Sequence, residues 1–313
     1  MGKKAVYKVK NWPEYNEALV KRGDITCWIN PVVIEEWLNV APSGKPGRPM
    51  TFSDATLEAM LALRSLFRLP LRSTEGLMRS IFAILDIEKP IPTYATLSRR
   101  QGRLDIDLGV GISEEPIHLL IDSTGLKVFG EGEWKARQHG KDIQRTWRKL
   151  HLGIDAATRE IVAVDVTDNS VGDSTVLPEL LLSVDAKISK VIADGAYDTW
   201  ECRYEIVERD AEAIIPPRNN ATERASEGSD EAINQRNEAV RHSQTHGKAA
   251  WKVASGYHKR SLVETTMFRV KKSFGPDTQA RLLQNQLAEM VMKSKILNQF
   301  IQNGLPVTVR VGD

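Results

Sequence analysis

Apolar residues at helical spacing dominate the first hundred residues. Two short helices are expected over residues 12–24 and 31–40. A longer helix is expected after Ser53, which favours an N-cap, because apolar residues follow it at intervals of three or four: Leu57, Met60, Leu63 and Phe67. After a proline break, another long helix is expected near residues 73–86, with Ser73 as its cap.

A short basic helix is expected over residues 93–104 (TYATLSRRQGRL). Its apolar side would bury Tyr94, Leu97 and Leu104. Its last turns would project three arginines together: Arg99, Arg100 and Arg103. Three short helices with a basic third one are similar to a helix-turn-helix, whose last helix enters the major groove of DNA. The alternative is a small bundle with a solvated basic edge.

From residue 117 the pattern changes to short apolar runs that alternate with helical segments. Two of these runs, over 117–121 and 187–193, predict strands that end at Asp122 and Asp194. The other elements expected are a hairpin of 148–154 with 160–167, helices over 173–183 and 198–209, and a strand over 213–217. This order predicts an α/β fold with a mixed sheet covered by helices.

The last hundred residues contain one polar segment and two helical ones. Residues 218–250 have almost no large apolar side chain, which indicates an insertion or mobile segment with one helix near 229–241. Residues 257–271 (YHKRSLVETTMFRVK) lack proline and glycine and predict a helix of about four turns. A long helix is expected over residues 278–302.

Composition sets broad limits. The chain has 313 residues, 41% of them hydrophobic, which is enough for a large core and two domains. Its two cysteines, Cys27 and Cys202, form no disulfide framework or zinc pattern, so a reducing cytoplasm is expected. No apolar run approaches the ~20 residues of a membrane span, and the N-terminus lacks a secretory apolar segment. We expect a cytoplasmic protein, associated with the nucleoid if it binds DNA.

Charge is nearly balanced, at +2, but it is unevenly distributed. Residues 127–151 carry seven Lys/Arg against three acids, and residues 251–272 carry six against Glu264 alone. Local basic stripes suit a polyanion gripped along particular surfaces. In the loop at 42–50, Gly47-Arg48-Pro49 could present Arg48 to a narrow minor groove, the alternative being an ordinary linker.

One face of the predicted helix 257–271 is unusual. At about 100° per residue, a single polar stripe contains Tyr257, Arg260, Glu264 and Lys271. An apolar stripe beside it predicts the core face. For this helix alone, the simplest interpretation is a solvated face with a weak Arg260–Glu264 pair.

Three acids form a candidate set. Asp122 and Asp194 each follow an apolar run and precede small residues, which would place them at a sheet edge that a ligand can reach. Either one alone is most simply a turn or capping residue. With Glu264 they would supply oxygen ligands, which favour Mg²⁺ or Mn²⁺. Two such ions could clamp a phosphodiester, and the basic stripes would hold the nucleic acid.

Other side chains are candidates for substrate contact. Lys149 and His151 lie on the predicted hairpin, where His151 could contact substrate or simply pack. Arg137 and His139 lie in the loop after the first acid, which could position a strand. The core is favoured over base stacking for three tryptophans: Trp147, Trp200 and Trp251.

The motifs resemble a known family. Tyr257, Arg260, Glu264 and Lys271 match the tyrosine–arginine–glutamate–lysine signature of DDE transposases from bacterial insertion sequences, and Asp122 and Asp194 match the other two acids. Four stretches (IDSTGLKVFGEGEWK, WRKLHLGID, ADGAYDT and GYHKRSLVETTMFR) are similar to the family named after insertion sequence five, in the subgroup typified by insertion sequence 903. The resemblance covers nearly the whole chain.

The resemblance implies a ribonuclease-H-like catalytic domain. It assigns Asp122, Asp194 and Glu264 to two Mg²⁺ or Mn²⁺ ions. It implies cleavage at terminal inverted repeats and joining of the 3′-OH ends to target DNA. The DNA backbone near the scissile phosphate would be contacted by Tyr257, Arg260 and Lys271.

A domain organisation follows. We expect a basic arm (1–10), a helical DNA-binding domain (11–104), a linker (105–116) and a catalytic domain (117–313) with a polar insertion at about 218–250. The expected partners are terminal-repeat DNA, target DNA and a second copy of the chain, because two ends must be brought together; no membrane or small-molecule substrate is expected. Two alternatives stay open: a metal-dependent endonuclease of the same fold that does not join ends, and a catalytically silent DNA-binding repressor.

Overall fold

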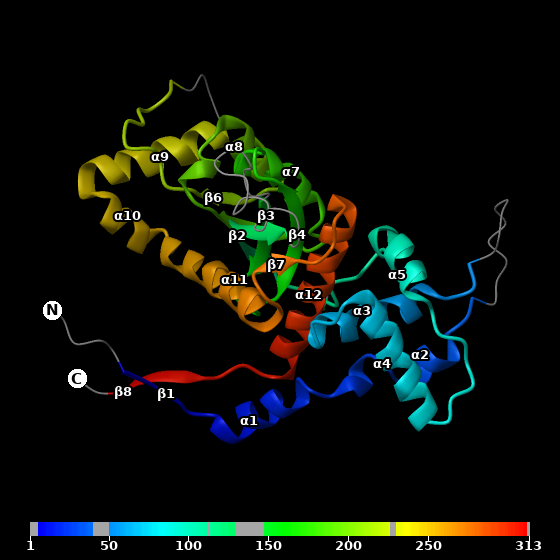
Figure 1. Cartoon of the computed structure of the whole chain (residues 1–313). Helices are drawn as coiled ribbons and strands as arrows, with labels where there is room; N and C mark the ends of the chain where they lie inside the picture. The colour runs from blue at the N-terminus through cyan, green and yellow to red at the C-terminus, as the bar shows by residue number, and fades with distance from the viewer. Residues whose placement is uncertain (1–5, 40–49, 112, 129–146, 226–229, 312–313) are drawn as a thin grey trace, which may run out of the picture.

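Six strands form a mixed sheet at the centre of the molecule (Figure 1): β2 Ile117–Val128, β3 Trp147–Asp155, β4 Ile161–Asp168, β5 Ile188–Ile192, β6 Glu212–Ile214 and β7 Asp277–Thr278. The strand order is β4-β3-β2-β5-β6, and β7 pairs with the far part of β2. This computed structural model describes every residue except 1–5, 40–49, 112, 129–146, 226–229 and 312–313.

The sheet combines an antiparallel half with a parallel half. β2, β3 and β4 are antiparallel neighbours, as the predicted hairpin requires, whereas β5 runs parallel to β2 and β6 parallel to β5. Helices cover both faces: α7 Asp173–Leu182 and α8 Trp200–Val207 on one, α11 Ser261–Phe274 and α12 Leu283–Asn303 on the other. This arrangement fits the ribonuclease-H-like domain that the sequence predicts.

β2 is longer than expected. The predicted strand ended at Asp122, but β2 continues to Val128 because β3 pairs with it as far as Lys127. On its other side, β5 pairs with β2 only as far as Leu120↔Ile192. Asp122 therefore lies inside a paired strand on the β3 side and beyond the last pair on the β5 side.

Alternate side chains of β2 enter two different cores, as the pleat requires. Leu119 and Ile121 face the core beneath α7 and α8. Leu120 and Leu126 face the core beneath α11 and α12. Asp122 shares the face of Leu120, so it points toward α11.

Helices make up most of the first hundred residues: α1 Trp12–Lys21, α2 Pro31–Glu35, α3 Asp54–Leu66, α4 Leu71–Ile84 and α5 Tyr94–Arg100. Ser53 caps α3 as predicted, and its Oγ accepts the N–H of Thr56 at 3.2 Å. The predicted Ser73 cap is wrong, because the Pro70 carbonyl already accepts the N–H of Thr74 and starts α4 earlier. Tyr94, expected in the core, is 40% exposed.

The helical segment and the sheet share a core. Leu61 and Ala62 of α3 belong to the same apolar cluster as the sheet face under α12, and Ile106 of the predicted linker is buried in it too. In Figure 1, α12 lies between the sheet and α3. The helical segment is therefore packed on the sheet and not merely tethered to it.

Both ends of the described chain are strands. β1 Val6–Val9 pairs antiparallel with β8 Thr308–Val311 (Figure 1). This pairing holds residues 6–9 of the predicted basic arm in place.

The segment around residue 240 is more ordered than its composition suggested. α9 Glu231–His246 confirms and extends the predicted helix, and it buries Ala232, Ile233 and Val240. α10 Lys248–Ala254 follows it and was not predicted. α9 contacts α8 and β6, so the insertion packs against the domain.

The predicted helix at 257–271 is divided in two. Tyr257–Arg260 forms a 3-10 turn, η4, and α11 continues from Ser261 to Phe274. Gly256 and Gly275 bracket the unit with positive φ angles of 72° and 91°, which glycine adopts at low cost.

Among the described residues, no helix combines the length and apolar character needed to cross a membrane.

Candidate active site

Two aspartates stand next to one another where β5 stops. The last parallel pair is Leu120↔Ile192, and Asp122 and Asp194 lie two residues further along their chains. Oδ1 of Asp194 accepts the N–H of Ala196 at 2.8 Å, which fixes its side chain at the start of a 3-10 turn. The strand-end placement therefore holds for Asp194 and, on the β5 side, for Asp122.

Arg260 connects the sheet to α11. Its Nη1 lies 2.6 Å from Oδ2 of Asp122, and its Nη2 pairs with Oε1 of Glu264, one helical turn further on. The Glu264 side chain remains 54% exposed, whereas that of Asp122 is only 14% exposed. The weak helix-surface pair inferred from sequence is thus one half of a bridge between two of the three predicted acids.

The electrostatics of the cluster depend on the same arginine. Burial raises the pKa of Asp122 above its usual value, against the opposing effect of Arg260, and Asp194 and Glu264 raise it further. Burial also disfavours the Arg260 cation, but Asp122, Glu264 and Asp194 hold the pKa of Arg260 above its usual value. All three predicted acids therefore act on one guanidinium.

Lys271 and Tyr257 flank this cluster on the same polar stripe. Nζ of Lys271 donates to Oγ1 of Thr124 on β2 at 2.6 Å, and burial lowers the pKa of Lys271. The Tyr257 ring centroid lies 5.9 Å from Cζ of Arg260 and 5.2 Å from Nζ of Lys252. The predicted stripe is therefore assembled against the sheet beside Asp122.

A second polar chain lies on the opposite face of β2. Oγ of Ser123 donates to Oδ2 of Asp173 at 2.9 Å, and Oδ1 of Asp173 accepts from Lys149 at 3.0 Å. Nζ of Lys149 also donates to the carbonyl of Val171 at 2.7 Å. Sequence reasoning gave Asp173 no place at the site, because 50 residues separate it from Ser123 and no local motif joins them.

The structure changes the predicted role of the hairpin. His151 is completely buried, and its Nε2 lies 2.9 Å from Oγ1 of Thr167. Burial lowers the pKa of His151. In this structure His151 packs inside the fold, which is one of its two interpretations, and the ammonium of Lys149 pairs with Asp173.

The three arginines near the end of α5 do not project together. Nη1 of Arg100 donates to the carbonyl of Phe52 at 2.6 Å, and its Nη2 pairs with Asp54 at the start of α3. Arg100 thus turns back onto the helical core, because the first turn of α3 offers it two acceptors. Arg99 and Arg103 are exposed.

Three predicted contact residues, Arg48, Arg137 and His139, lie outside the described residues. Of the tryptophans, Trp251 is buried as expected, and Trp147 is half-buried. Trp200 is not in the core: its ring is half-buried between the guanidinium groups of Arg224 and Arg236, at 4.9 and 5.0 Å from the ring centroid.

The acids suit a divalent metal by chemistry but not by their present spacing. Within the described ranges, no three Asp, Glu, His or Cys side chains are close enough to hold an ion as they stand. Arg260 lies between two of them and supplies the positive charge. Carboxylate oxygens from β2, from the end of β5 and from α11 form the oxygen-only set that Mg²⁺ prefers. The residues fit a divalent ion provided that Arg260 moves away.

Two family models match the chain, and both are described as "Transposase DDE domain". One matches residues 20–131, which include helices α2 to α5 and Asp122. The other matches residues 113–299, more than half of the 313 residues, and contains Asp122, Asp194 and Glu264.

Proposed function

The chain belongs to the transposases that carry a DDE domain, and from this premise we propose that it cuts DNA at the terminal inverted repeats of an insertion sequence and joins the freed 3′ ends to target DNA. Membership implies a DNA substrate and a divalent metal, typically Mg²⁺. The observation that carries the proposal is the Arg260 bridge, which brings Glu264 of α11 to Asp122 of the sheet. We also propose that the chain belongs to the subgroup typified by insertion sequence 903.

Each residue of the cluster has a role in this proposal. Asp122, Asp194 and Glu264 would hold two divalent ions, which would supply Lewis-acid stabilisation of the charge on the scissile phosphate. Arg260 exchanges its two carboxylates for a DNA phosphate, which a guanidinium binds in bidentate fashion. Tyr257, in the turn that contains Arg260, and Lys271, about three helical turns further on, hold the same strand.

The positioning of Asp122 depends on the sheet around it. Its Oδ1 accepts the N–H of Ser123 at 2.9 Å, and Ser123 is held in turn by Asp173. We assign Asp173 and Lys149 to positioning of β2 rather than to DNA contact. A carboxylate that must meet both a metal and a phosphate benefits from such a rigid support.

We further propose that the helical segment (11–104) recognises the terminal repeats. Arg99 and Arg103 are exposed and can contact phosphates. Arg48 of the same segment remains a predicted contact, as do Arg137 and His139 of the catalytic domain. Removing the whole segment would expose the core it shares with α12, so point variants are the better test. The double variant Arg99→Gln/Arg103→Gln should weaken end binding in gel-shift titrations and reduce its salt slope by about 1 per lost phosphate contact. Unchanged binding would contradict the assignment.

A strand-transfer assay tests the reaction. With Mg²⁺ and duplex ends, Asp122→Ala should abolish both cleavage and joining while end binding persists, because the residue holds the metal and not the DNA. Asp165→Asn, which changes an aspartate on β4 of the same sheet, is the matched control and should retain activity. A variant Asp122→Ala that still cuts would show that the metal assignment is wrong.

Pre-cleaved ends separate the transposase from a nuclease of the same fold. Joining of a pre-cleaved 3′-OH end to plasmid DNA supports the proposal. Cleavage of intact ends without joining would favour the nuclease, and end binding without either reaction would favour a silent repressor. We propose a dimer for the joined complex, which sedimentation of the protein with and without paired ends would reveal.

A further inference from the structure

A basic cavity of about 310 Å³ lies on the side of α11 remote from the acids. At about 100° per residue, Arg269 is roughly 140° around the helix from Glu264. The cavity is lined by α11, by residues of α1 and just after it, by the turn between β3 and β4, and by the chain that follows α12. Four lining residues are cationic, and none of the described lining residues is acidic: Arg22, Arg159, Arg269 and Lys272 carry the charge.

These cations have no carboxylate partners. In the part of the chain that the structure describes, none of the four takes part in an ion pair. Nε of Arg22 is buried and has no hydrogen-bond partner, while its Cζ lies 5.2 Å from the ring centroid of Phe300. Unpaired charge of one sign is costly where it is partly buried, as it is at Arg22 and Arg269, and a bound anion would offset that cost.

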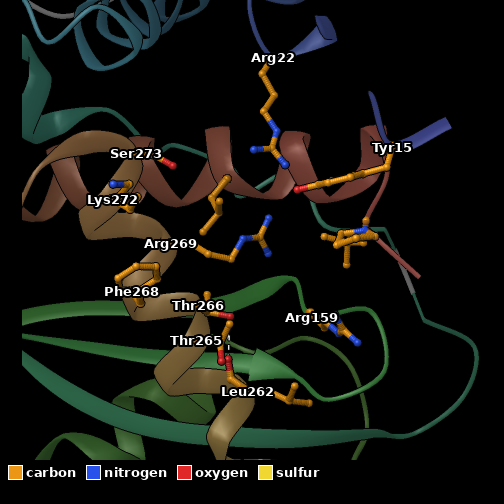
Figure 2. A pocket seen from close by; sticks show the side chains of 13 residues that line it. Tyr15, Arg22, Arg159, Leu262, Thr265, Thr266, Phe268, Arg269, Lys272 and Ser273 are labelled. Carbon is orange, nitrogen blue, oxygen red and sulfur yellow. Dashed lines mark hydrogen bonds between the residues drawn. The ribbon is translucent and has the colours of Figure 1, made fainter. Parts of the chain in front are cut away.

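The charges act on one another across the cavity. Burial lowers the pKa of Arg269, and the Arg22 and Arg159 cations lower it further. Figure 2 shows the guanidinium groups of Arg22 and Arg269 pointing toward one another, with the hydroxyl end of Tyr15 beside them. The arginines thus converge from segments that are more than a hundred residues apart in sequence.

The backbone at Arg159 is also unusual. Arg159 has a φ of 66°, in the left-handed region that arginine rarely adopts, and it places its side chain at the rim of the cavity (Figure 2). Such a conformation costs on the order of 1–2 kcal/mol.

We propose that this cavity binds a phosphate group. Guanidinium groups match phosphate oxygens in charge and in planar, bidentate geometry, and several arginines around one space are typical of phosphate recognition. Tyr15 adds a hydroxyl donor, and the apolar side chains of Leu262, Leu297 and Pro306 shield the rim from water. The phosphate belongs either to a DNA strand that passes behind α11 or to a free phosphate compound.

Thermal unfolding tests for a phosphate site directly. At constant ionic strength, sodium pyrophosphate should raise the Tm of the wild-type chain in proportion to the logarithm of its concentration, compared with sodium chloride. The double variant Arg22→Gln/Arg269→Gln should lose this rise. Without pyrophosphate, the variant should be at least as stable as wild type, because it relieves repulsion between like charges. Arg209→Gln, which removes an arginine whose Nη1 lies 3.4 Å from the Val184 carbonyl, is the control and should keep the rise.

Salt titration of duplex binding identifies the source of the phosphate. If a DNA strand supplies it, the double variant should lower the slope of log K against log salt by about 1 per lost contact. A lost Tm rise with an unchanged slope assigns the site to a free phosphate compound. No Tm rise in wild type together with an unchanged slope in the variant overturns the proposal. The slope of log K against log salt should also be measured on Asp122→Ala, which is expected to bind DNA without cutting it. This measurement distinguishes a failure of the phosphate proposal from a failure of the proposed reaction.

Discussion

Two of the clusters that carboxylates form with cations have opposite character. At the contact of α3 with α12, Glu289 is surrounded by Lys293 at 2.8 Å, Arg64 at 3.8 Å and the backbone N–H groups of residues 279 and 280. At the edge of the sheet, one cation, Arg260, pairs with both Asp122 and Glu264. The first cluster satisfies its carboxylate completely, whereas the second leaves carboxylate oxygens available.

Exposure separates the two clusters as clearly as bonding does. The side chains of Glu289, Lys293 and Arg64 are 2%, 5% and 6% exposed, while that of Glu264 is 54% exposed. Lys293 and Arg64 outweigh burial and lower the pKa of Glu289, but Arg260 fails to do so for Asp122. Pairs of carboxylates with cations therefore stabilise the fold at one place, and at the other they can exchange their partners for a ligand.

Breaking the buried cluster should have the largest effect on stability. Glu289→Ala leaves Lys293 and Arg64 buried without their carboxylate, which should cost about 3–5 kcal/mol of unfolding free energy. Urea titration followed by circular dichroism measures this loss. Glu58→Ala is the control on the same pair of helices, since Glu58 makes a more exposed pair with Lys295 at 2.7 Å. Equal losses for the two variants would remove the distinction between the clusters.

Neutralising the site aspartate should change stability far less. Asp122→Asn removes one Arg260 bond but also removes a carboxylate that burial disfavours, so the unfolding free energy should stay within about 1 kcal/mol of wild type. The same variant should lose DNA cleavage. A loss of stability as large as that of Glu289→Ala would mean that Asp122 is chiefly structural.

The contributions of Glu289 and Asp122 to stability should change in opposite directions as the pH falls. This is the smallest of the effects predicted for the two clusters. The lowered folded-state pKa of Glu289 means that its contribution is present above its unfolded pKa of about 4.3 and is lost as the pH falls through the folded value. The raised folded-state pKa of Asp122 means that proton uptake stabilises the folded chain as the pH falls through that value.

Comparing the pH dependence of stability in wild type and Asp122→Asn isolates the second contribution. The wild type should gain stability relative to the variant as the pH falls from neutral toward about 4. A relative loss over this interval would contradict the raised pKa of Asp122.

Local pattern was sufficient for part of the site. The two strand-end aspartates and the stripe on helix 257–271 identified the side chains that meet, because strand pairing and helical period fix the direction of each. The pattern placed the end of β2 wrongly, since pairing with β3 sets that length. It also left open whether His151 packs or touches substrate, because burial depends on α7 and β4.

The contacts beyond the site could not be read from local pattern. Glu289 and Arg64 are 225 residues apart, and Ser123 and Asp173 are 50 apart, so neither pair leaves a motif. The cationic cavity is similar: Arg22, Arg159 and Arg269 stand in segments that look like ordinary solvated surface. In each case the fold, and not the spacing, creates the chemistry.

The Arg260 bridge has a consequence for the order of assembly. A guanidinium keeps its proton at any physiological pH, so loss of its charge cannot release it from Asp122 and Glu264. Another anion can compete with the carboxylates for this guanidinium, and a backbone phosphate in the right position would draw it away and free both carboxylates in one event. By reciprocity, whatever binds to the freed carboxylates must strengthen the hold on that phosphate. A polyanion without a phosphate in this position would leave Asp122 and Glu264 paired with Arg260. The two carboxylates would therefore become available only when the DNA strand is bound in the correct position.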